Sequence, residues 1–511
     1  MARFLVTCVV TGILMLGFAA GADAISKPIA IGSNATGLPS APAVAVDPTG
    51  TAYIVWLTSP ADTVLNFCKI PVGATGCSAV TLQVPNPSHA QYFDPPSVLV
   101  NGTDVYVFEE VDGAANNNQN GMYLWLSTDG GATFSPYPYA LSYTAVGDTA
   151  GTGPMPVIPL PGGNVGFAYV AAAGNPVFQT NSLGSPANYS PGAYPPTKPP
   201  PPFATLNPSP NNYVVGNLGG EIVSQLSGTT GLLGVFQMLE TGPCPSNEGL
   251  VFTYAALTAA TTNAALDTSP GPGSPWSPLA GVQCNTESPA VTSGPSGLGL
   301  LFTNDANHRT QFRRFSAPAT FGAAVTVAPG AALGPTLTQD GAGGLYATWL
   351  NNGTGLRLAY SNNGGKSWFG PTTLARDTSG SISYQGIASA TGSSGQGWAV
   401  YASGGTEYAQ PFDAADALPP KITHLKLHGA RISYTDTQPA KTKFKVLELV
   451  KGHAPKTVGT FSHTDVAGKN SFHWNRRVDG HTLAAGSYKL EATPSLGAVK
   501  GKTVSVTFTI S

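Results

Sequence analysis

The chain has 511 residues, of which 24 are Lys or Arg and 26 are Asp or Glu, giving a formal net charge of −2. With 62 Gly, 45 Pro and only 10% charged residues, it has little material for long amphipathic helices. Short runs rich in Val, Thr, Tyr and Ala are instead separated by Gly and Pro. This pattern predicts an all-β protein whose apolar content suffices for a core, and it argues against a disordered chain.

The first segment is typical of a secretory signal peptide. Arg3 precedes an apolar run over residues 4–20, and the small residues of "ADA" end at Ala24, where we expect cleavage. An uncleaved anchor is the alternative, but the apolar run is short for a spanning helix. No Cys follows the cleavage site, which argues against a lipoprotein. We therefore expect a secreted, extracellular protein without a transmembrane segment.

Four cysteines remain in the mature chain: Cys68, Cys77, Cys244 and Cys284. An even number in an exported protein favours disulfides over metal binding. Proximity in sequence suggests the pairs Cys68–Cys77 and Cys244–Cys284, one of three possible pairings. No CxxC motif or histidine cluster accompanies them, so we predict neither a metal site nor a cofactor.

A motif of apolar strand, turn and apolar–aromatic strand recurs seven times between residues 40 and 403. Its anchor residues are spaced by 46 to 68 positions: Val44, Val98, Val157, Val223, Val291, Leu337 and Ala388. Two further β-like runs follow the copies, so each unit has four short strands. Radial repetition of such units predicts a β-propeller over residues 25–418. Seven blades are expected, with six as the alternative because the last copy is degenerate.

Two segments within this region need their own interpretation. The last unit lacks an obvious fourth strand, and residues 27–32, "KPIAIG", can supply it by pairing the two ends of the ring. The Pro-rich stretch near residues 190–212 predicts an extended, exposed insertion between two units.

Two octets, "STDGGATF" and "SNNGGKSW", follow the third predicted strand of their units. The pattern Ser-x-Asp-x-Gly-x-Ser/Thr-Trp/Phe resembles the Asp box of sialidase-like propellers. The matching residues are Ser127, Asp129, Gly131, Thr133 and Phe134 in the first octet, and Ser361, Asn363, Gly365, Ser367 and Trp368 in the second. The short polar residue accepts local N–H groups, Gly takes positive φ and the aromatic packs beneath the turn. We interpret both octets as structural, with Cys68 and Cys77 stapling the same place in the first unit.

The resemblance to sialidases implies three converging arginines, a Tyr–Glu pair and an acid/base residue. The chain departs from this pattern, because no arginine lies between Arg3 and Arg309. The other arginines of this region, all in its last three units, are Arg313, Arg314, Arg357 and Arg376. Glu109 and Glu110 point to opposite faces of a strand and cannot form a carboxylate dyad. We predict glycan or cell-surface binding without catalysis. The alternatives are a divergent exo-sialidase or other glycoside hydrolase, and a purely structural envelope protein.

The best polar constellation lies in "TNDANHRTQFRRF", which we expect in a loop between the second and third strands of its unit. In propellers of this type that loop faces the pole opposite the Asp boxes, where ligands usually bind. Amide-rich loops at residues 112–121, 240–247 and 351–355 share that pole. The candidate ligand-binding residues are Asp305, His308, Arg309, Arg313, Asn117, Asn118 and Glu240. The alternative is that these loops are only solvated.

Charge divides the chain near residue 419. Residues 419–511 hold eleven Lys and three Arg against five acidic residues, a net charge of +9, whereas residues 25–418 carry −11. Six of the eight histidines also lie in this C-terminal segment. The asymmetry predicts a separate basic domain. The positive charge suits association with anionic cell-wall polymers, lipid headgroups or nucleic acid. We expect glycans or cell-wall polymers as partners, and no specific nucleic-acid partner. The alternatives are that the lysines only solubilise the domain, or that it docks on the acidic propeller. We expect a monomer.

Alternating strands over residues 419–511 predict a β-sandwich. The stretch "HWNRRVDGHTLAAGSYKLEA" resembles bacterial Ig-like modules, including the hook-capping-protein type. The residues that carry the match are Trp474, Asp479, Gly480, Leu483, Gly486 and Tyr488. The resemblance implies that Trp474 and Tyr488 lie in the core and that Gly486 serves the turn before a strand. Three residues, Asn475 to Arg477, separate the Trp from the Asp-Gly pair, so the loop differs from the family's.

Overall fold

The computed structural model describes residues 27–33, 42–58, 64–83, 92–93, 96–112, 121–135, 139–140, 157–160, 164–171, 175–182, 204–205, 214–217, 230–239, 249–257, 277–278, 289–304, 308–316, 320–330, 332–351, 355–376, 387–437, 440–466, 468–496 and 499–511. The chain divides into two compact units, Ile25–Pro419 and Pro420–Ser511. One short helix, α1 (Ala414–Ala417), occurs among the described residues, and every other element is a strand. The all-β prediction is confirmed. Within these ranges no helix has the length and apolar character needed to span a membrane.

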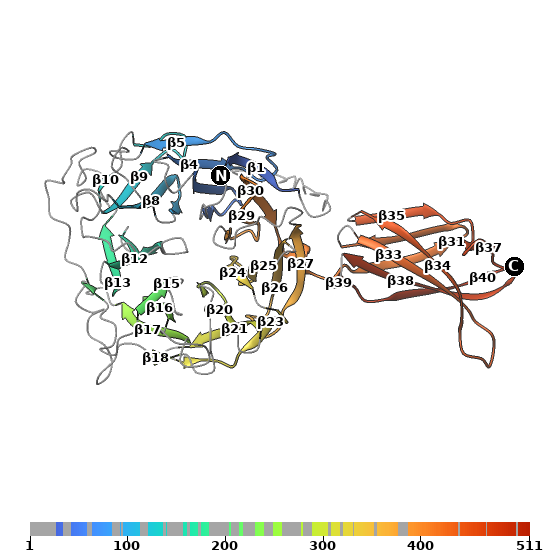
Figure 1. The fold of residues 1–511 in the computed structure, drawn as a ribbon. Helices are drawn as coiled ribbons and strands as arrows, with labels where there is room; N and C mark the ends of the chain where they lie inside the picture. The colour runs from blue at the N-terminus through green and yellow to red at the C-terminus, as the bar shows by residue number, and fades with distance from the viewer. Residues whose placement is uncertain are drawn as a thin grey trace, which may run out of the picture. The chain divides into compact units, whose positions relative to one another are not determined.

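The described part of the first unit contains seven small antiparallel sheets (Figure 1). The first sheet consists of β2 (Ala43–Val46), β3 (Ala52–Leu57), β4 (Val64–Ile70) and β5 (Val80–Gln83). The second consists of β6 (Tyr92–Phe93), β7 (Ser97–Asn101), β8 (Asp104–Asp112), β9 (Gly121–Ser127) and β10 (Tyr139–Ala140). The third consists of β11 (Val157–Leu160), β12 (Asn164–Ala171), β13 (Asn175–Ser182) and β14 (Ala204–Thr205), and the fourth of β15 (Val214–Asn217), β16 (Thr230–Leu239), β17 (Gly249–Leu257) and β18 (Ser277–Pro278). The fifth sheet consists of β19 (Ala290–Thr292), β20 (Leu298–Asn304), β21 (Arg309–Ser316), β22 (Thr320–Phe321) and β23 (Val325–Ala328). The sixth consists of β24 (Leu333–Gln339), β25 (Leu345–Asn351), β26 (Gly355–Ser361) and β27 (Phe369–Ala375). The seventh consists of β28 (Ile387–Thr391), β29 (Gly397–Ser403), β30 (Thr406–Phe412) and β1 (Ile29–Ser33).

The sheets surround a common centre (Figure 1), and we call β2, β7, β11, β15, β19, β24 and β28 the first strands of their sheets. Neighbouring first strands contact one another in the order β11, β7, β2, β28, β24 and β19. Radial placement of small antiparallel sheets is the β-propeller architecture. The predicted closure is confirmed, because β1 pairs with β30, with Ile29 opposite Ala409 and Ser33 opposite Thr406.

Two sequence expectations differ from the structure. The strand that pairs with β16 is β15, Val214–Asn217, upstream of the predicted anchor Val223, which lies outside the described residues. Part of the supposed Pro-rich insertion is also built into a sheet, because β14 pairs with β13 through Thr205 opposite Val177.

The apolar cores of the first unit lie between neighbouring sheets. Tyr53, Val55 and Phe67 of the first sheet pack with Val107 and Trp125 of the second. Equivalent clusters join the fifth sheet to the sixth, the sixth to the seventh, and the seventh to the first. The strands are therefore buried on both faces, which explains continuous apolar runs such as "AYIVWL" in β3.

The second unit contains two stacked sheets and a hairpin. One sheet consists of β31 (Ile422–His428), β32 (Arg431–Asp436) and β35 (Gly468–His473). The other consists of β34 (Lys456–Asp465), β33 (Ala440–Glu448), β38 (Gly486–Leu496), β39 (Val499–Lys500) and β40 (Val504–Ile510). The hairpin is formed by β36 (Arg477–Val478) and β37 (His481–Thr482). Trp474, Leu483 and Tyr488 lie in the shared core. Gly486 is the first residue of β38, and the positive-φ turn glycine of this stretch is Gly480, at φ 84°.

Candidate functional site

The first unit has two distinct poles, which its first strands define. Thr336 and Thr338 of β24 hydrogen bond to Ser389 and Thr391 of β28, so these neighbouring strands run in the same direction. Their first turns meet at one end, where Gly341 donates to the carbonyl of Ser393 over 3.2 Å. We call this end the turn pole. The opposite end, where second strands lead into third strands, is the loop pole.

The turn pole is filled by contacts between the turns themselves. Gln339 bridges to the preceding turn, because its Oε1 accepts from Ser296 N at 2.9 Å and its Nε2 donates to Gly297 O at 2.7 Å. Asp340 accepts from Gly344 N at 2.8 Å and from the Tyr346 hydroxyl at 2.9 Å. Burial, and then the charge and hydrogen bond of Asp340, raise the pKa of Tyr346 far above its ordinary value. The turn of the first sheet repeats this device.

In the first sheet Asp47 accepts from Thr49 N, Thr51 N and the Tyr53 hydroxyl, at 2.8, 3.0 and 3.3 Å. Burial raises the pKa of Asp47, but the hydrogen bond from the Thr49 hydroxyl at 2.6 Å and the three bonds above outweigh burial and hold the pKa below its ordinary value. Burial and the nearby Asp47 raise the pKa of Tyr53 to about 12. Asp340 likewise accepts from Ala342 N at 2.9 Å. An acid that accepts from residues two, four and six positions later is thus shared by the first and sixth sheets, and its role is structural.

Both octets close hairpins at the turn pole, and both dock on the preceding sheet. Ser127 Oγ accepts from Gly131 N at 2.8 Å, and Gly130 N donates to Thr103 O at 2.8 Å, which joins the octet to the first turn of its own sheet. Lys69 Nζ of the first sheet donates to Gly130 O at 2.9 Å. Phe67, two residues before Lys69, packs edge-on against Phe134 with ring centroids 4.7 Å apart.

The second octet repeats these contacts on the fifth sheet. Ser361 Oγ accepts from Gly365 N at 2.9 Å, and Phe312 packs edge-on against Trp368 with centroids 5.4 Å apart. Arg314, two residues after Phe312, lies so close to Gly364 that an added Cβ would come within 2.5 Å of its Nη1. Each octet therefore receives an aromatic ring and a cation from the third strand of the sheet before it.

The first sheet carries a disulfide at the equivalent position. Cys68 of β4 bonds to Cys77 in the segment between β4 and β5, with an S–S distance of 2.03 Å. The other predicted pair, Cys244–Cys284, lies outside the described residues. In the seventh sheet helix α1 follows β30, and Ala414 and Ala417 pack in the cluster that contains Leu356 and Leu358 of β26.

At the loop pole the predicted ligand loop of the fifth sheet has a well-defined base. Asn304, which ends β20, and Gln311 of β21 are buried, and Asn304 Nδ2 donates to Gln311 Oε1 at 3.3 Å. Thr310 donates through its N and Oγ1 to Gly330 O at 3.0 and 2.9 Å. On this fixed base His308, with a positive φ of 50°, and Arg309 are both exposed. The side chains of Asp305, Asn117, Asn118 and Glu240 lie outside the described residues.

The structure separates Arg313 from this loop, which corrects the sequence prediction. Arg313 and Arg314 lie inside β21, and alternate along it, so they point to opposite faces of the fifth sheet. The Arg313 guanidinium lies 5.7 Å from the centre of the Phe302 ring, and burial lowers its pKa. Sequence reasoning placed both residues in the loop because it set the start of the third strand too late.

Several acidic groups of the first unit are enclosed. The side chains of Glu109 and Glu407 are fully buried in β8 and β30. Asp416 in α1 was not singled out from sequence, although the spacing "DAAD" signals a capping box. Asp413 Oδ1 accepts from Ala415 N at 2.7 Å, and Asp416 Oδ2 accepts from Asp413 N at 2.9 Å. Burial and the charge of Asp413 raise the pKa of Asp416 to about 7.

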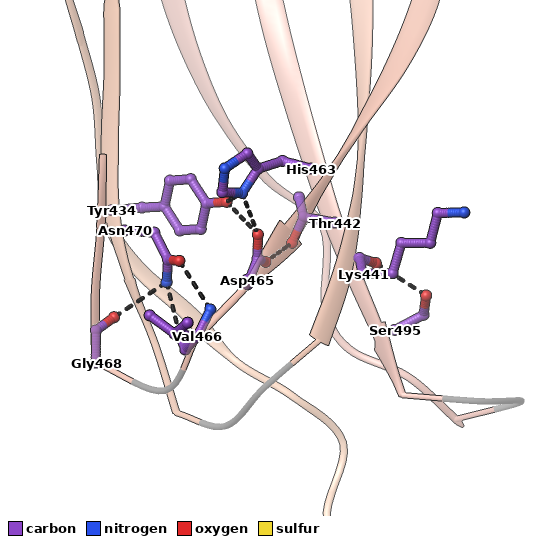
Figure 2. A network of polar contacts seen from close by, with 9 residues as sticks. All are labelled: Tyr434, Lys441, Thr442, His463, Asp465, Val466, Gly468, Asn470 and Ser495. Carbon is purple, nitrogen blue, oxygen red and sulfur yellow. Dashed lines mark hydrogen bonds and ion pairs between the residues drawn. The ribbon is translucent and has the colours of Figure 1, made fainter. Parts of the chain in front are cut away.

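The second unit contains a polar network at one end of its core (Figure 2). The buried carboxylate of Asp465 accepts from the Tyr434 hydroxyl at 2.5 Å, from Thr442 Oγ1, and from His463 Nδ1 at 2.8 Å. Burial, followed by the hydrogen bond and charge of Asp465, raises the pKa of Tyr434 far above its ordinary value. The His463 ring stacks on Phe472 with centroids 4.1 Å apart. Sequence reasoning missed this network, although "SHTD" places a His and an Asp at alternate, inward-facing positions of one strand.

The network clamps the two sheets together and is not a ligand site. Tyr434 comes from one sheet, whereas Thr442, His463 and Asp465 come from the other. The following loop is fixed by Asn470, whose Oδ1 accepts from Val466 N at 2.9 Å and whose Nδ2 donates to Val466 O at 2.7 Å (Figure 2). The Asp465 side chain is buried and bonds to three side chains of the same unit, so its contacts serve to join the two sheets. No group of three or more His, Cys, Asp or Glu residues suited to a metal ion occurs in the described part of the chain.

No family model and no curated protein sequence match the chain. An alpha-L-arabinanase of Penicillium chrysogenum, complexed with arabinobiose, is 11% identical, with 77% of this chain and 99% of that chain covered and a TM-score of 0.45. The sialidase of Trypanosoma rangeli is 10% identical over 84% of this chain and 86% of its own, with a TM-score of 0.39. A mutant of the Aleuria aurantia lectin AAL, in complex with Fucalpha1-6GlcNAc, is 8% identical over 82% and 95%, with a TM-score of 0.36. A likeness this distant carries no argument about activity.

Proposed function

We propose that the first unit is a seven-bladed, sialidase-like propeller that binds extracellular glycans at its loop pole without cleaving them. The observation that carries the proposal is a difference between the two poles in what their polar side chains contact. At the turn pole the polar side chains named above bond within the protein, Asp340 inside its own turn and Gln339 and Lys69 to the turn of a neighbouring sheet. At the loop pole the exposed His308 and Arg309 stand on a buried amide pair, and the other loops there are rich in Asn, Gln and Gly. Neutral amide groups suit hydrogen bonding to sugar hydroxyls.

The placement of the arginines supports binding without sialidase chemistry. No arginine occurs from residue 4 to residue 308, so the first four sheets contribute none. Arg313 covers Phe302, Arg314 lies on the octet of the next sheet, and Arg357 Nη1 donates to Thr373 Oγ1 at 2.5 Å. The other two arginines, Arg309 at the start of β21 and Arg376 directly after β27, belong to the same two sheets, so three arginines from three separate blades cannot converge on one carboxylate.

We further propose that the protein is secreted and that the second unit is an Ig-like domain for association with cell surfaces. The leader over residues 1–24 supports export, and the Cys68–Cys77 disulfide is of the kind that persists in oxidising compartments. The two stacked sheets with Trp474 and Tyr488 in their core support the Ig-like assignment. Seven sheets within Ile25–Pro419 support seven blades over six among the described strands.

The mature protein should be tested on an array of neutral and acidic glycans, followed by calorimetry with the strongest ligand. Replacing His308 and Arg309 together by Ala removes two exposed polar contacts and should weaken binding about tenfold. The pair Asn117→Ala and Asn118→Ala and the single change Glu240→Gln test the other predicted loops. Lys366→Ala is the matched control, because Lys366 is an exposed cation at the turn pole.

The outcomes separate the competing functions. A ligand whose binding is reduced by Lys366→Ala, but by none of the loop variants, would contradict the loop pole as the site. Release of free sugar from a bound glycan, lost in the Glu240→Gln variant, would favour the glycoside hydrolase alternative. Absence of any glycan ligand would favour a purely structural role.

A further inference from the structure

One face of the second unit carries only cationic and hydroxyl side chains. It is the outer face of the sheet formed by β31, β32 and β35, where alternate residues point away from the core. The outward residues are Lys426 and His428 on β31, Arg431, Ser433 and Thr435 on β32, and Lys469, Ser471 and His473 on β35. We call this surface the basic face.

Three basic groups of this face lie in one row across the sheet. Arg431 on the central strand is directly opposite His428 on one side and His473 on the other. Neighbouring strands are about 4.8 Å apart, so the three side chains are within reach of a single anionic group. All three residues are exposed, and Arg431 Nη1 also donates to Ser471 Oγ at 3.1 Å.

No carboxylate offsets this row. The one acidic residue on the three strands is Asp436, and it is buried in the core. The other basic residues near the row are Lys426 on β31 and Lys469 on β35, together with His424 in the bulge of β31. Arg476 also lies nearby, because its Nη2 donates to Gly429 O at 3.3 Å. Of the strands of the other sheet that contact β31, β40 has no charged residue, and β38 turns Lys489 and Glu491 to the opposite outer surface.

The opposite surface shows how a basic sheet can be balanced within the unit. There Lys489 Nζ lies 2.8 Å from Glu491 Oε1, and Glu491 is directly opposite Lys445. The basic face has no such pair. Arg431 lies directly between His428 and His473, and any charge on these histidines has the same sign as the charge of Arg431. Like charges directly opposite one another in a sheet are destabilising, and a bound anion relieves that cost.

The composition of the basic face favours one class of anion. Its hydroxyl groups, Ser433, Thr435 and Ser471, can bond to the hydroxyls of a sugar polymer while the cations meet its carboxylates. The face has no aliphatic or aromatic side chain other than imidazole, so it lacks the apolar groups that enter a bilayer and the rings on which bases stack.

We propose that the basic face binds an acidic polysaccharide, and that His428 and His473 strengthen this binding as the pH falls. The inference deepens the surface association proposed above and does not depend on the ligand of the loop pole. Arg431 supplies a permanent charge, whereas histidine is the side-chain type whose charge changes across the mildly acidic to neutral range. Binding is therefore weaker near neutral pH and stronger at mildly acidic pH.

Binding of the mature full-length protein to immobilised polygalacturonate tests the proposal, at about pH 5.5 and about pH 7.5, near the two ends of the range in which histidine side chains generally change charge. We expect affinity to be about tenfold higher at the lower pH, because two added charges contribute modestly each. His428→Gln with His473→Gln should bring the ratio of the two affinities close to one. Arg431→Gln should weaken binding at both pH values.

The matched control is Lys441→Gln with Lys443→Gln, which removes two exposed charges from the other outer surface and should leave the pH ratio unchanged. His308→Ala with Arg309→Ala should also leave it unchanged, so that failure of the loop-pole proposal remains distinguishable. Equal affinity at both pH values, or loss of the pH ratio in the Lys control, would overturn the proposal. Displacement of the polymer by an equal charge of double-stranded DNA or anionic vesicles would assign the face to another partner class and equally overturn it.

Discussion

The two octets at the turn pole make the same turn with different chemistry. In the first, Asp129 Oδ1 accepts from Thr133 N at 2.9 Å and Oδ2 accepts from Thr133 Oγ1 at 2.6 Å. In the second, Asn363 Oδ1 accepts from Ser367 N at 3.0 Å, but Nδ2 donates to Ser367 Oγ at 2.7 Å. The hydroxyl of the residue four positions later changes from donor to acceptor, and the turn is kept. The shared elements are therefore the serine hydroxyl that accepts from the glycine N–H, the glycines themselves and the packing against the preceding sheet, not the charge.

The largest effect is expected where the octet glycines meet the preceding sheet. Gly131 and Gly365 both have φ of 82°, and an added Cβ would lie 2.6 Å from Phe67 Cζ and 2.0 Å from Phe312 Cε1. Gly365→Ala combines backbone strain with overpacking, so the free energy of unfolding should fall by about 3 kcal/mol. Gly131→Ala should cost somewhat less, because its clash is smaller. Urea denaturation followed by tryptophan fluorescence measures both.

Gly102→Ala is the matched control for that comparison. Gly102 also lies at the turn pole with φ of 63°, but an added Cβ would meet nothing within 4 Å. Only the backbone strain remains, so Gly102→Ala should lower the free energy of unfolding by about 1 kcal/mol. If Gly365→Ala cost no more than Gly102→Ala, contact with Phe312 would not be what fixes the octet.

Much of this architecture could be predicted from sequence because its signals are local. Paired apolar runs around a Gly-rich turn mark each hairpin, and the missing last strand pointed to residues 27–32 for closure. The prediction of the first strand was wrong in the fourth unit. Both "YVVGN" and "EIVSQL" satisfy the same short pattern, and only pairing with β16 selects Val214–Asn217. The two-residue strand Ala204–Thr205 has no local signal at all, because its conformation is set by pairing to β13.

The candidate site was less accessible to sequence reasoning, for a similar reason. Which residue of "NHRTQFRRF" begins the strand depends on its pairing with β20, where Arg309 is opposite Asn304. Once that register is known, His308 and Arg309 fall at the loop pole, whereas Arg313 and Arg314 fall within the sheet. The basic face of the second unit is likewise a product of register, because His428, Arg431 and His473 come together only through strand pairing.

Helix α1, which packs on the sixth sheet, is expected to respond to pH. The pKa of Asp416 is raised from 3.8 to about 7, so ionising it is harder in the folded than in the unfolded state. The free energy of unfolding should therefore fall as the pH rises from about 4 to about 7, by about 2 kcal/mol after allowing for partial exposure. Asp416→Asn should remove this fall while keeping an acceptor for Asp413 N.

Asp413→Asn is the companion variant, measured in the same urea series across that pH range. It keeps the cap of α1 but removes the charge that contributes to the raised pKa of Asp416. We expect the fall to persist but to become smaller. An Asp416→Asn profile that coincides with that of the unmodified protein would show that another group carries the pH dependence.

The smallest effect concerns the octet carboxylate itself. The Thr133 hydroxyl, the Thr133 N–H and the Ser127 hydroxyl together lower the pKa of Asp129 to about 2. A folded-state pKa below the ordinary 3.8 means that the turn is stabilised above that pH and loses this contribution as the pH falls through about 2.

Asp129→Asn should behave like the natural Asn363 octet, with little change at neutral pH and no acid-induced opening. Asn363→Asp should make the second octet acid-sensitive as well. Hydrogen exchange at the Gly131 and Gly365 amides, which donate to Ser127 and Ser361, reports the two turns separately. If acid opened the Asn363 octet as readily as the Asp129 octet, the carboxylate could not be the group that distinguishes them.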